Sequence, residues 1–319
     1  LPPLGAAGTI ADNSLDVGAS TPVLDGRIVA SPCAPLCDGA RDDARLETQG
    51  QRPKEHMEQG SKNKTGAHSS SRPSPLASHQ ARVENALVIF AKAPTPGEVK
   101  TRLCPPLTPD EAATLHGSFV LDMLERSKLA VAKLQLPFHR YLACAPSSEL
   151  VFFKIMEERQ DVHLLDQVGE DLGQRMHRTS VDLFAKGYKQ VIIVGTDVPT
   201  LPLSVYQEAF AMLGRSDVVL GPALDGGYYL IGLKQPAEKL FAGVPWSRDQ
   251  VLAVTQQNAK TLGLSVGLTT AWRDVDTIAD LQALITECQE DNKKPKQDRT
   301  FSMRTAGTLQ LLATRLKTR

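Results

Sequence analysis

Two short apolar runs, each followed by an aspartate in a loop that contains Gly and Pro, constrain the fold of this chain most. The runs are residues 191–194 and 218–220, and a helix-like sequence separates them. Continuous apolar runs of this length indicate parallel strands that are buried on both faces. Asp197 follows the first run and Asp225 follows the second. Because ligands of open α/β sheets bind beyond the carboxyl ends of the strands, we expect both aspartates at the ligand-binding edge.

The same alternation of apolar strands and capped, amphipathic helices extends from residue 86 to residue 289. It predicts a single α/β domain with a mostly parallel sheet and helices on both faces. Residues 228–233 follow the strand at 218–220 without an intervening helix, so we expect one antiparallel pair. A further acidic pair, Asp274 and Asp276, follows an apolar run near residue 270 and is expected at the same edge.

The segments on either side of this domain have a different composition. Residues 1–85 are rich in Pro, Gly, Ser and Ala without sustained periodicity, which predicts disorder because too little apolar surface can be buried. Residues 290–319 read as a basic C-terminal tail, with eight Lys or Arg against two Asp from residue 291 onwards. The favoured interpretation is a solvated tail with a short helix around Leu309 to Leu316, and a weak contact with an anionic surface is the alternative.

The bulk composition argues against several classes of protein. The formal net charge of zero provides no field that would attract nucleic acid or a membrane surface. The longest apolar run, residues 86–91, is too short to span a bilayer, and the start of the sequence has no signal-peptide pattern. Five cysteines without a CxxC motif suggest neither a disulfide framework nor a zinc site. We therefore expect a cytoplasmic protein with a small-molecule substrate.

The loop after the strand at 86–91 contains clustered cations. Lys92, Lys100 and Arg102 surround a segment with two prolines and Gly97. Cations and free backbone N–H groups at this edge suit a phosphate chain, although a solvated loop with ordinary surface cations is the alternative. Neither GxGxxG nor GxxxxGK[ST] occurs in the chain, which disfavours dinucleotide dehydrogenases and P-loop enzymes.

The carboxylates suggest a hard divalent cation. Mg²⁺ and Mn²⁺ bind to one or two carboxylates together with phosphate oxygens. Asp197 is one candidate ligand, and Asp274 or Asp276 could supply the second from another strand end. The alternatives are a turn residue for Asp197 and a charge at a helix N-terminus for Asp276.

The segment from Asp225 to Tyr229 suits an acceptor site. Gly226 and Gly227 permit close backbone approach to a ligand, and the same Asp-Gly pair is typical of a hairpin turn. Tyr228 and Tyr229 point to opposite faces of an extended strand, so we expect at most one of them in the pocket. Trp246 is either a wall of the acceptor site or a core residue.

Three histidines of the core, His116, His163 and His177, lack the spacing of metal ligands and are interpreted as structural or exposed.

Six motifs occur in one order along the predicted domain. They are Pro94-x-Pro96-Gly97-x-Val99-Lys100-Thr101-Arg102-Leu103, Gly169-x-Asp171-Leu172-Gly173-x-Arg175-Met176, Gly195-Thr196-Asp197-x-Pro199-x-Leu201, Gly221-Pro222-Ala223-x-Asp225-Gly226-Gly227-Tyr228-Tyr229-Leu230-Ile231-Gly232-Leu233, Pro245-Trp246 and Asp274-Val275-Asp276-Thr277. Together they closely resemble a bacterial family of GT-A-like transferases with a Rossmann-like, nucleotide-diphospho-sugar transferase fold. Its members are called radical-SAM- or selenodomain-associated transferases, or arsenosugar-biosynthesis glycosyltransferases. The chain is also similar to guanylyltransferases that attach GMP to phospholactate.

The resemblance implies a role for each matching residue. The phosphates of a nucleotide or nucleotide-sugar would be bound by Lys92, Gly97, Lys100, Arg102 and Arg175. A small-molecule acceptor would contact Gly226, Gly227, Tyr228 and Trp246. Asp197 and Asp276 would hold Mg²⁺ or Mn²⁺, and the catalytic residues would be Asp225 and Asp197.

The reaction itself stays open between alternatives. A metal-dependent glycosyltransferase with a nucleotide-sugar donor is the first hypothesis, and a nucleotidyltransferase acting on a small phosphorylated acceptor is the second. Glycosyltransferases of this fold usually carry Asp-x-Asp, whereas Gly195-Thr196-Asp197 has only the last acid, which favours the second hypothesis. The family also usually has an acid where Leu224 stands. A nucleotide-binding protein without turnover is the alternative from another class.

Overall fold

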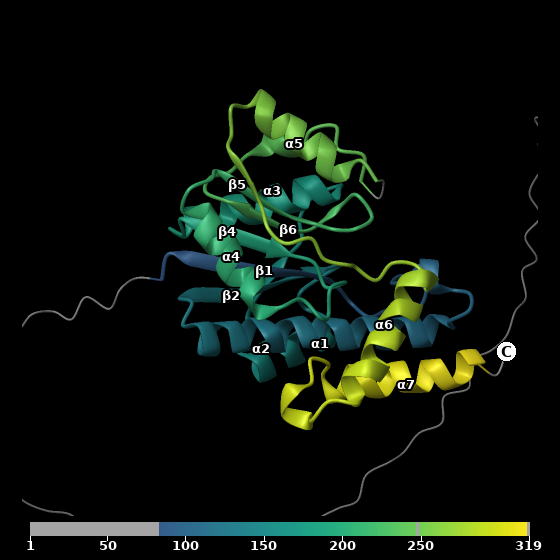
Figure 1. Cartoon of the computed structure of the whole chain (residues 1–319). Coiled ribbons are helices and arrows are strands. Elements are labelled where there is room, and N and C mark those ends of the chain that lie inside the picture. The colour runs from purple at the N-terminus through teal and green to yellow at the C-terminus, as the bar shows by residue number, and fades with distance from the viewer. Residues whose placement is uncertain (1–82, 247–248, 318–319) are drawn as a thin grey trace, which may run out of the picture. The chain divides into compact units, whose positions relative to one another are not determined.

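The computed structural model describes residues 83–246 and 249–317 (Figure 1). The predicted disorder of residues 1–85 therefore falls almost wholly outside the described residues. Seven strands form one sheet in the order β3-β2-β1-β4-β6-β5-β7. The strands are β1 Asn85–Lys92, β2 Phe138–Ala145, β3 His163–Asp166, β4 Gln190–Val194, β5 Val218–Pro222, β6 Tyr228–Leu233 and β7 Val266–Leu268.

The helices cover both faces of this sheet, which confirms the predicted α/β class. The α-helices are α1 Pro109–Leu134, α2 Val151–Gln160, α3 Leu172–Ala185, α4 Leu203–Leu213, α5 Val251–Thr261, α6 Ile278–Asn292 and α7 Met303–Lys317. The 3-10 helices are η1 Thr101–Leu103, η2 Glu238–Phe241 and η3 Lys296–Asp298. The predicted cap of α1 is present, because the Thr108 side chain accepts from the Glu111 N–H and Glu111 accepts from the Thr108 N–H.

The sheet is parallel except at β6. This strand lies between β4 and β5 and is antiparallel to both, so the expected single antiparallel pair becomes two. The turn between β5 and β6 thereby lies at the same edge as the end of β4. An insertion of this kind depends on which strands meet in three dimensions, and the order of strands along the chain does not specify it.

Alternation along β1 divides the core into two layers. Leu87 and Ile89 face α1, α2 and α4, whereas Ala86 and Val88 face α3, α5 and η2. All four side chains are at most 1% exposed, which is the burial on both faces that continuous apolar strands predict.

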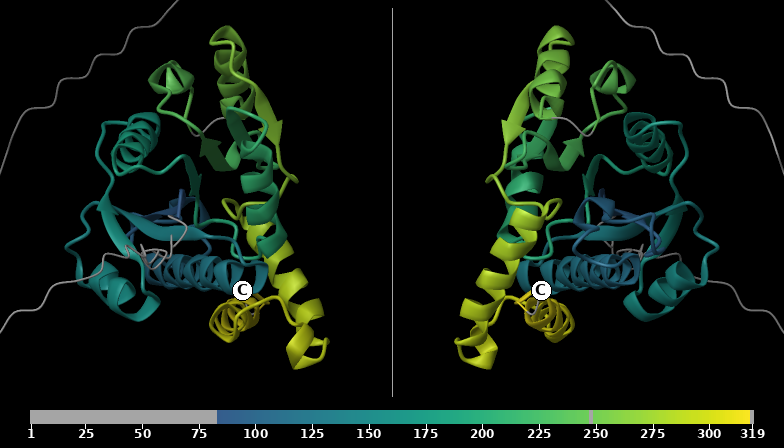
Figure 2. Two further views of the ribbon diagram at one scale, coloured as in Figure 1. Left: turned by 90° about the vertical axis from the view of Figure 1, so that its left-hand side faces the viewer. Right: turned by 90° about the vertical axis from the view of Figure 1, so that its right-hand side faces the viewer.

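The C-terminal segment packs on the core, although the sequence analysis favoured a solvated tail. Leu309, Leu312 and Ala313 of α7 are buried against α1 and α6 in a third cluster. Both views of Figure 2 show α1 between the sheet and α7. The buried carboxylate of Asp122 on α1 accepts hydrogen bonds from Arg304 at 3.1 Å and from the Thr305 hydroxyl at 2.6 Å. The apolar face of this amphipathic helix is therefore covered, and Arg304 pairs with a buried carboxylate of the core.

Within the described part of the chain, no helix is long and apolar enough to cross a membrane.

Candidate active site

A pocket of about 530 Å³ opens at the carboxyl ends of β1 and β4. Its walls come from the loop after β1, the end of β4, the turn between β5 and β6, and the segment that precedes α6. Parallel strands place their carboxyl ends at one edge, and this edge is where ligands of open α/β sheets bind. The pocket therefore combines the cationic loop and all three acidic segments that the sequence singles out.

Backbone hydrogen bonds hold these distant segments together. The Gly195 N–H donates to the Tyr229 carbonyl at 2.9 Å, which joins the end of β4 to β6. The Val275 N–H donates to the Asp197 carbonyl at 2.9 Å. Asp197 and Asp276 lie at one wall of the pocket for this reason, although they are far apart in the sequence.

Lys100 lies at the centre of the acidic wall. Its ammonium is 2.7 Å from Asp197 Oδ1 and 3.1 Å from Asp276 Oδ1, and it donates to the Val275 carbonyl at 2.5 Å. The Lys100 side chain is only 4% exposed. Its backbone has a φ of 49°, a left-handed conformation that non-glycine residues rarely adopt. Lys100 thus has an uncommon backbone conformation, and its ammonium lies between two carboxylates.

The two ion pairs that Lys100 makes with Asp197 and Asp276 stabilise the charged forms of these side chains. Burial lowers the pKa of Lys100, but the carboxylates of Asp197 and Asp276 outweigh that effect and raise the pKa above its usual value. Burial likewise raises the pKa of Asp197, and the Lys100 ammonium reverses this, so that the net shift is downward. Lys100 is therefore an ammonium and Asp197 a carboxylate at neutral pH.

Asp276 is available to the pocket because other residues cap α6. The Thr277 side chain and the Asp280 carboxylate form a capping box at the start of this helix. The alternative interpretation of Asp276, a charge that stabilises a helix N-terminus, applies to Asp280 instead. Arg102 approaches Asp276 to 3.8 Å from the opposite side, and its side chain is 58% exposed.

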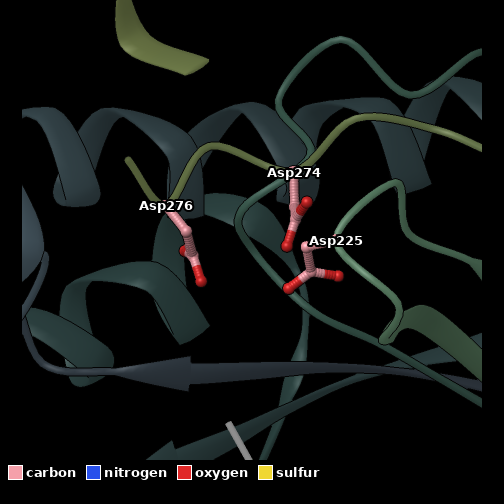
Figure 3. Close-up of side chains that lie close together, drawn as sticks. All are labelled: Asp225, Asp274 and Asp276. Carbon is pink, nitrogen blue, oxygen red and sulfur yellow. The ribbon is translucent and has the colours of Figure 1, made fainter. Parts of the chain in front are cut away.

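Three carboxylates gather at the other end of the wall (Figure 3). One oxygen from each of Asp225, Asp274 and Asp276 lies within 4.8 Å of the others. Figure 3 shows the Asp274 side chain extending toward Asp225, the Asp225 side chain extending in the same direction, and Asp276 beside them. Burial raises the pKa of Asp274 to about 7, and repulsion from Asp225 and Asp276 adds to the shift. A group of this composition could bind a hard divalent cation through its oxygens.

The turn that carries Asp225 requires glycine. Gly226 has a φ of 91°, and a Cβ there would lie 2.1 Å from the Asp249 carbonyl oxygen. Asp225 Oδ1 accepts the Gly227 N–H at 2.8 Å, which fixes its side chain across the turn. The hairpin interpretation and the site interpretation of this motif therefore hold together.

His116 is a pocket residue that the sequence analysis interpreted as structural or exposed. It belongs to α1, its side chain is 6% exposed, and its Nδ1 is 4.0 Å from Asp197 Oδ1. Its Nε2 is 3.1 Å from the Lys92 carbonyl, which can only accept, so Nε2 carries the proton. Burial lowers the pKa of His116 and outweighs the neighbouring Asp197, so the ring is neutral at pH 7. Only the fold brings α1 beside β4, and the spacing of His116 gives no signal of this.

The predicted nucleotide-binding residues divide into two groups. Lys92, Lys100 and Arg102 line the pocket. Gly97, with a φ of 83°, and Arg175, which donates to the Gly169 carbonyl at 3.0 Å, lie outside the lining. The nucleotide-binding role of all five stays a prediction.

The acceptor-side residues surround the turn between β5 and β6. Gly227, Tyr228 and Trp246 line the pocket, with the Tyr228 and Trp246 rings 6.5 Å apart, whereas Gly226 lies just behind the lining. Tyr229 also lines the pocket, so the expectation that at most one of the two tyrosines would do so is wrong. The two rings do pack on opposite layers of the core, but the pocket wraps around the end of the sheet and reaches both.

Comparison with known proteins shows which fold this chain has and which family it belongs to. The chain has the nucleotide-diphospho-sugar transferase-like fold. A crystal structure from Desulfovibrio desulfuricans G20, described as a "putative nucleotide-diphospho-sugar transferase", is 31% identical and superposes with a TM-score of 0.63. The match covers 74% of this chain and 97% of that protein. Residues 129–248 match the family described as "Uncharacterized protein conserved in bacteria (DUF2064)". The chain belongs to this family.

Other solved structures match this chain at much lower similarity. A cytidylyltransferase from Leptospira borgpetersenii is 14% identical, with a TM-score of 0.44, over 74% of this chain and 96% of that one. The inositol-1-phosphate CTP transferase of T. maritima is 12% identical, with a TM-score of 0.43, over 64% of this chain and 94% of that one. The curated proteins give no match.

Proposed function

We propose that this protein is a nucleotide-dependent transferase that acts with Mg²⁺ or Mn²⁺ on a small-molecule acceptor. The observation that carries the proposal is the composition of the pocket, where Lys92, Lys100 and Arg102 face the acidic wall. Cations suit the phosphates of a nucleotide, and carboxylates suit the divalent ion that accompanies them. The other side of the pocket, around Tyr228 and Trp246, then takes the acceptor.

Two places on the acidic wall suit a divalent cation, and they share Asp276. One is the gap between Asp197 and Asp276, and the other is the group of Asp225, Asp274 and Asp276. We assign the nucleotide-associated cation to the first place, because the Lys100 ammonium already shows that a positive charge fits there. When bound, the ion neutralises charge that develops on the pyrophosphate.

Glycosyl transfer from a nucleotide-sugar is the reaction that we favour. The family relative from Desulfovibrio desulfuricans is described by a name of this class. An inverting glycosyl transfer also needs a base for the neutral hydroxyl of the acceptor, and Asp225 is our candidate for this role. Asp225 lines the pocket, and the turn holds its side chain through the hydrogen bond from the Gly227 N–H. Asp197 would act in catalysis by holding the cation.

Nucleotidyl transfer is the second candidate, and one sequence observation favours it. The end of β4 carries a single acid, Asp197, whereas metal-dependent glycosyltransferases of this fold usually have two. A phosphate acceptor would attack as an anion, so that positioning and charge neutralisation supply most of the catalysis. Asp225 would then be dispensable.

The Asp225→Asn variant separates the two reactions. We expect its rate to fall by about 10²- to 10⁴-fold if Asp225 is the general base of an inverting glycosyltransferase. The measurement is single-turnover product formation from nucleotide-sugars and from nucleoside triphosphates, with the anomeric configuration of any sugar product determined by NMR.

A small effect of the substitution, together with pyrophosphate release from a triphosphate, would reject glycosyl transfer in favour of nucleotidyl transfer. Nucleotide binding that Mn²⁺ does not strengthen, without any product, would reject both in favour of a nucleotide-binding protein. Asp182→Asn on the exposed end of α3 is the matched control, since it removes the same charge outside the pocket.

A further inference from the structure

The side chain of His116 leaves one buried ring nitrogen without a hydrogen-bond partner. Nε2 donates to the Lys92 carbonyl at the end of β1, which leaves Nδ1 as a bare acceptor. Among the described residues no group satisfies this Nδ1, although the side chain is only 6% exposed. A buried polar atom without a partner is costly, and in native proteins such an atom calls for a specific explanation.

The partner that Nδ1 lacks must be a hydrogen-bond donor or a cation, because this nitrogen can only accept. The atom that it faces is Asp197 Oδ1 at 4.0 Å, and both atoms are acceptors. Two ligands bound to one ion at about 2.1 Å each lie about 3–4 Å apart, depending on the angle at the metal. A divalent cation between Asp197 and His116 would therefore require only a small adjustment of either side chain.

The second ring nitrogen supports the same conclusion. Histidines that bind metals usually donate their other N–H to a carboxylate or a backbone carbonyl, which fixes the tautomer and the orientation of the ring. His116 has this arrangement, with the Lys92 carbonyl as the acceptor at 3.1 Å. Asp197 is already beside a positive charge, the Lys100 ammonium at 2.7 Å. The Asp197 oxygen that accepts this positive charge, Oδ1, is the same atom that His116 Nδ1 approaches.

We propose that His116 Nδ1 is a ligand of the divalent cation beside Asp197. The site then combines imidazole nitrogen with carboxylate oxygen, a donor set that favours Mn²⁺ and other transition ions over Mg²⁺, which prefers oxygen alone. This inference rests on the proposed function only for the presence of the ion, and it names a residue of α1 as a determinant of which ion is used.

Pulsed electron paramagnetic resonance of Mn²⁺ added to the full chain without nucleotide tests this directly. We expect the bound ion to show coupling to a directly ligated ¹⁴N nucleus. His116→Asn should abolish the coupling and weaken Mn²⁺ binding by at least about tenfold, because even the loss of an outer-shell partner of a metal ligand typically costs that much. Mg²⁺ should compete better with Mn²⁺ in this variant than in the wild type.

His163→Asn is the matched control, because His163 is an exposed histidine on β3 outside the pocket lining, and both the coupling and the affinity should survive in it. Bound Mn²⁺ without nitrogen coupling in the wild type would overturn the proposal, and this result needs no variant to fold. Unchanged Mn²⁺ affinity of folded His116→Asn would also overturn it, as would the absence of Mn²⁺ binding at millimolar concentration. Failure of the proposed function would appear differently, as nitrogen-coupled Mn²⁺ in a protein without nucleotide affinity.

Discussion

At the scale of single residues, the Lys100 ammonium occupies the place that we assign to the cation. It lies between Asp197 and Asp276, while the cationic loop to which Lys100 belongs is assigned to phosphate. Both assignments hold if the lysine neutralises the carboxylates in the free protein and moves to the phosphates when the nucleotide arrives with its ion. Lys100 would then be a competitor of the metal and a ligand of the nucleotide.

Replacing Lys100 by Met should therefore change the affinity for Mn²⁺ and the affinity for nucleotide in opposite directions. We expect Mn²⁺ to bind the free variant more tightly by about tenfold, the equivalent of about 1.4 kcal/mol of removed competition. Nucleotide should bind more weakly. Calorimetric titration with each ligand measures both effects, and Lys154→Met, which removes a surface ion pair with Glu149 outside the pocket, serves as the control. Weaker Mn²⁺ binding by Lys100→Met would contradict this account.

The raised pKa of Asp274 predicts how the stability of the folded protein depends on pH. Burial and its two acidic neighbours raise the pKa of Asp274 to about 7, above the value of about 3.9 expected for the unfolded chain. A raised pKa favours the folded state when the group is protonated, so this contribution is complete below about pH 4 and is lost as the pH rises toward 7.

The variant Asp274→Asn, which stays neutral, should therefore be more stable than the wild type above pH 7. We expect a gain on the order of 1–2 kcal/mol, because solvent screening reduces the full effect of the shift. The gain should disappear near pH 4. Denaturant unfolding at both pH values, in buffer with a chelator to remove metal ions, provides the measurement. Equal stability of the two proteins at pH 8 would contradict the assigned shift.

At the scale of elements, α7 determines how the C-terminal segment contributes to the fold. Leu309 is 1% exposed against α1 and α6, whereas Leu311, two residues further along the same helix, is 75% exposed. Leu309 is therefore a buried position to test, and Leu311 is an exposed control on the same helix.

We expect Leu309→Ala to lower the free energy of unfolding by about 2–5 kcal/mol, through lost burial and the cavity that remains. Leu311→Ala should change it by less than about 0.5 kcal/mol, as is usual at the surface. Both values come from denaturant unfolding curves. If the two variants lost the same stability, the packing of α7 on the core would be refuted and the solvated tail favoured by the sequence analysis restored.

At the scale of the whole molecule, the pocket joins segments that depend on the complete sheet. A ligand that fills it would contact the loop after β1, the end of β4 and the segment before α6 together. Binding to the folded state alone raises stability by about 2.7 kcal/mol when the ligand is present at 100 times its dissociation constant. For a domain of this size that corresponds to a rise in Tm of several degrees, at about 2–4 °C per kcal/mol.

A matching nucleotide and Mn²⁺ should thus raise the Tm together by more than either does alone. Asp276→Asn should remove the dependence on Mn²⁺ while the folded protein persists, because Asp276 belongs to both candidate cation positions. Thermal shift over a panel of nucleotides and nucleotide-sugars measures this, with Asp182→Asn again as the control. An undiminished Mn²⁺ effect in Asp276→Asn would remove this residue from the site.

The amino-acid sequence by itself determined the class of the fold and the edge where the site lies. Apolar runs such as 191–194 specify buried parallel strands, and a parallel strand delivers the residue that follows it to a known edge. This is why Lys100, Asp197, Asp225 and Asp276 could be assigned to one pocket from local pattern alone. The cap of α1 was predictable for the same reason, since it depends on residues only three apart.

Only the tertiary structure decided which of these groups touch. The insertion of β6 between β4 and β5, the ion pairs of Lys100 and the approach of His116 to Asp197 all join segments that are distant in the sequence. The packing of α7 is of this kind too, because an amphipathic helix buries its apolar face only where another element offers a matching surface, here α1. Local pattern fixes the face that a residue occupies, whereas contact depends on the relative placement of whole elements, which is set by the sum of many weak packing interactions.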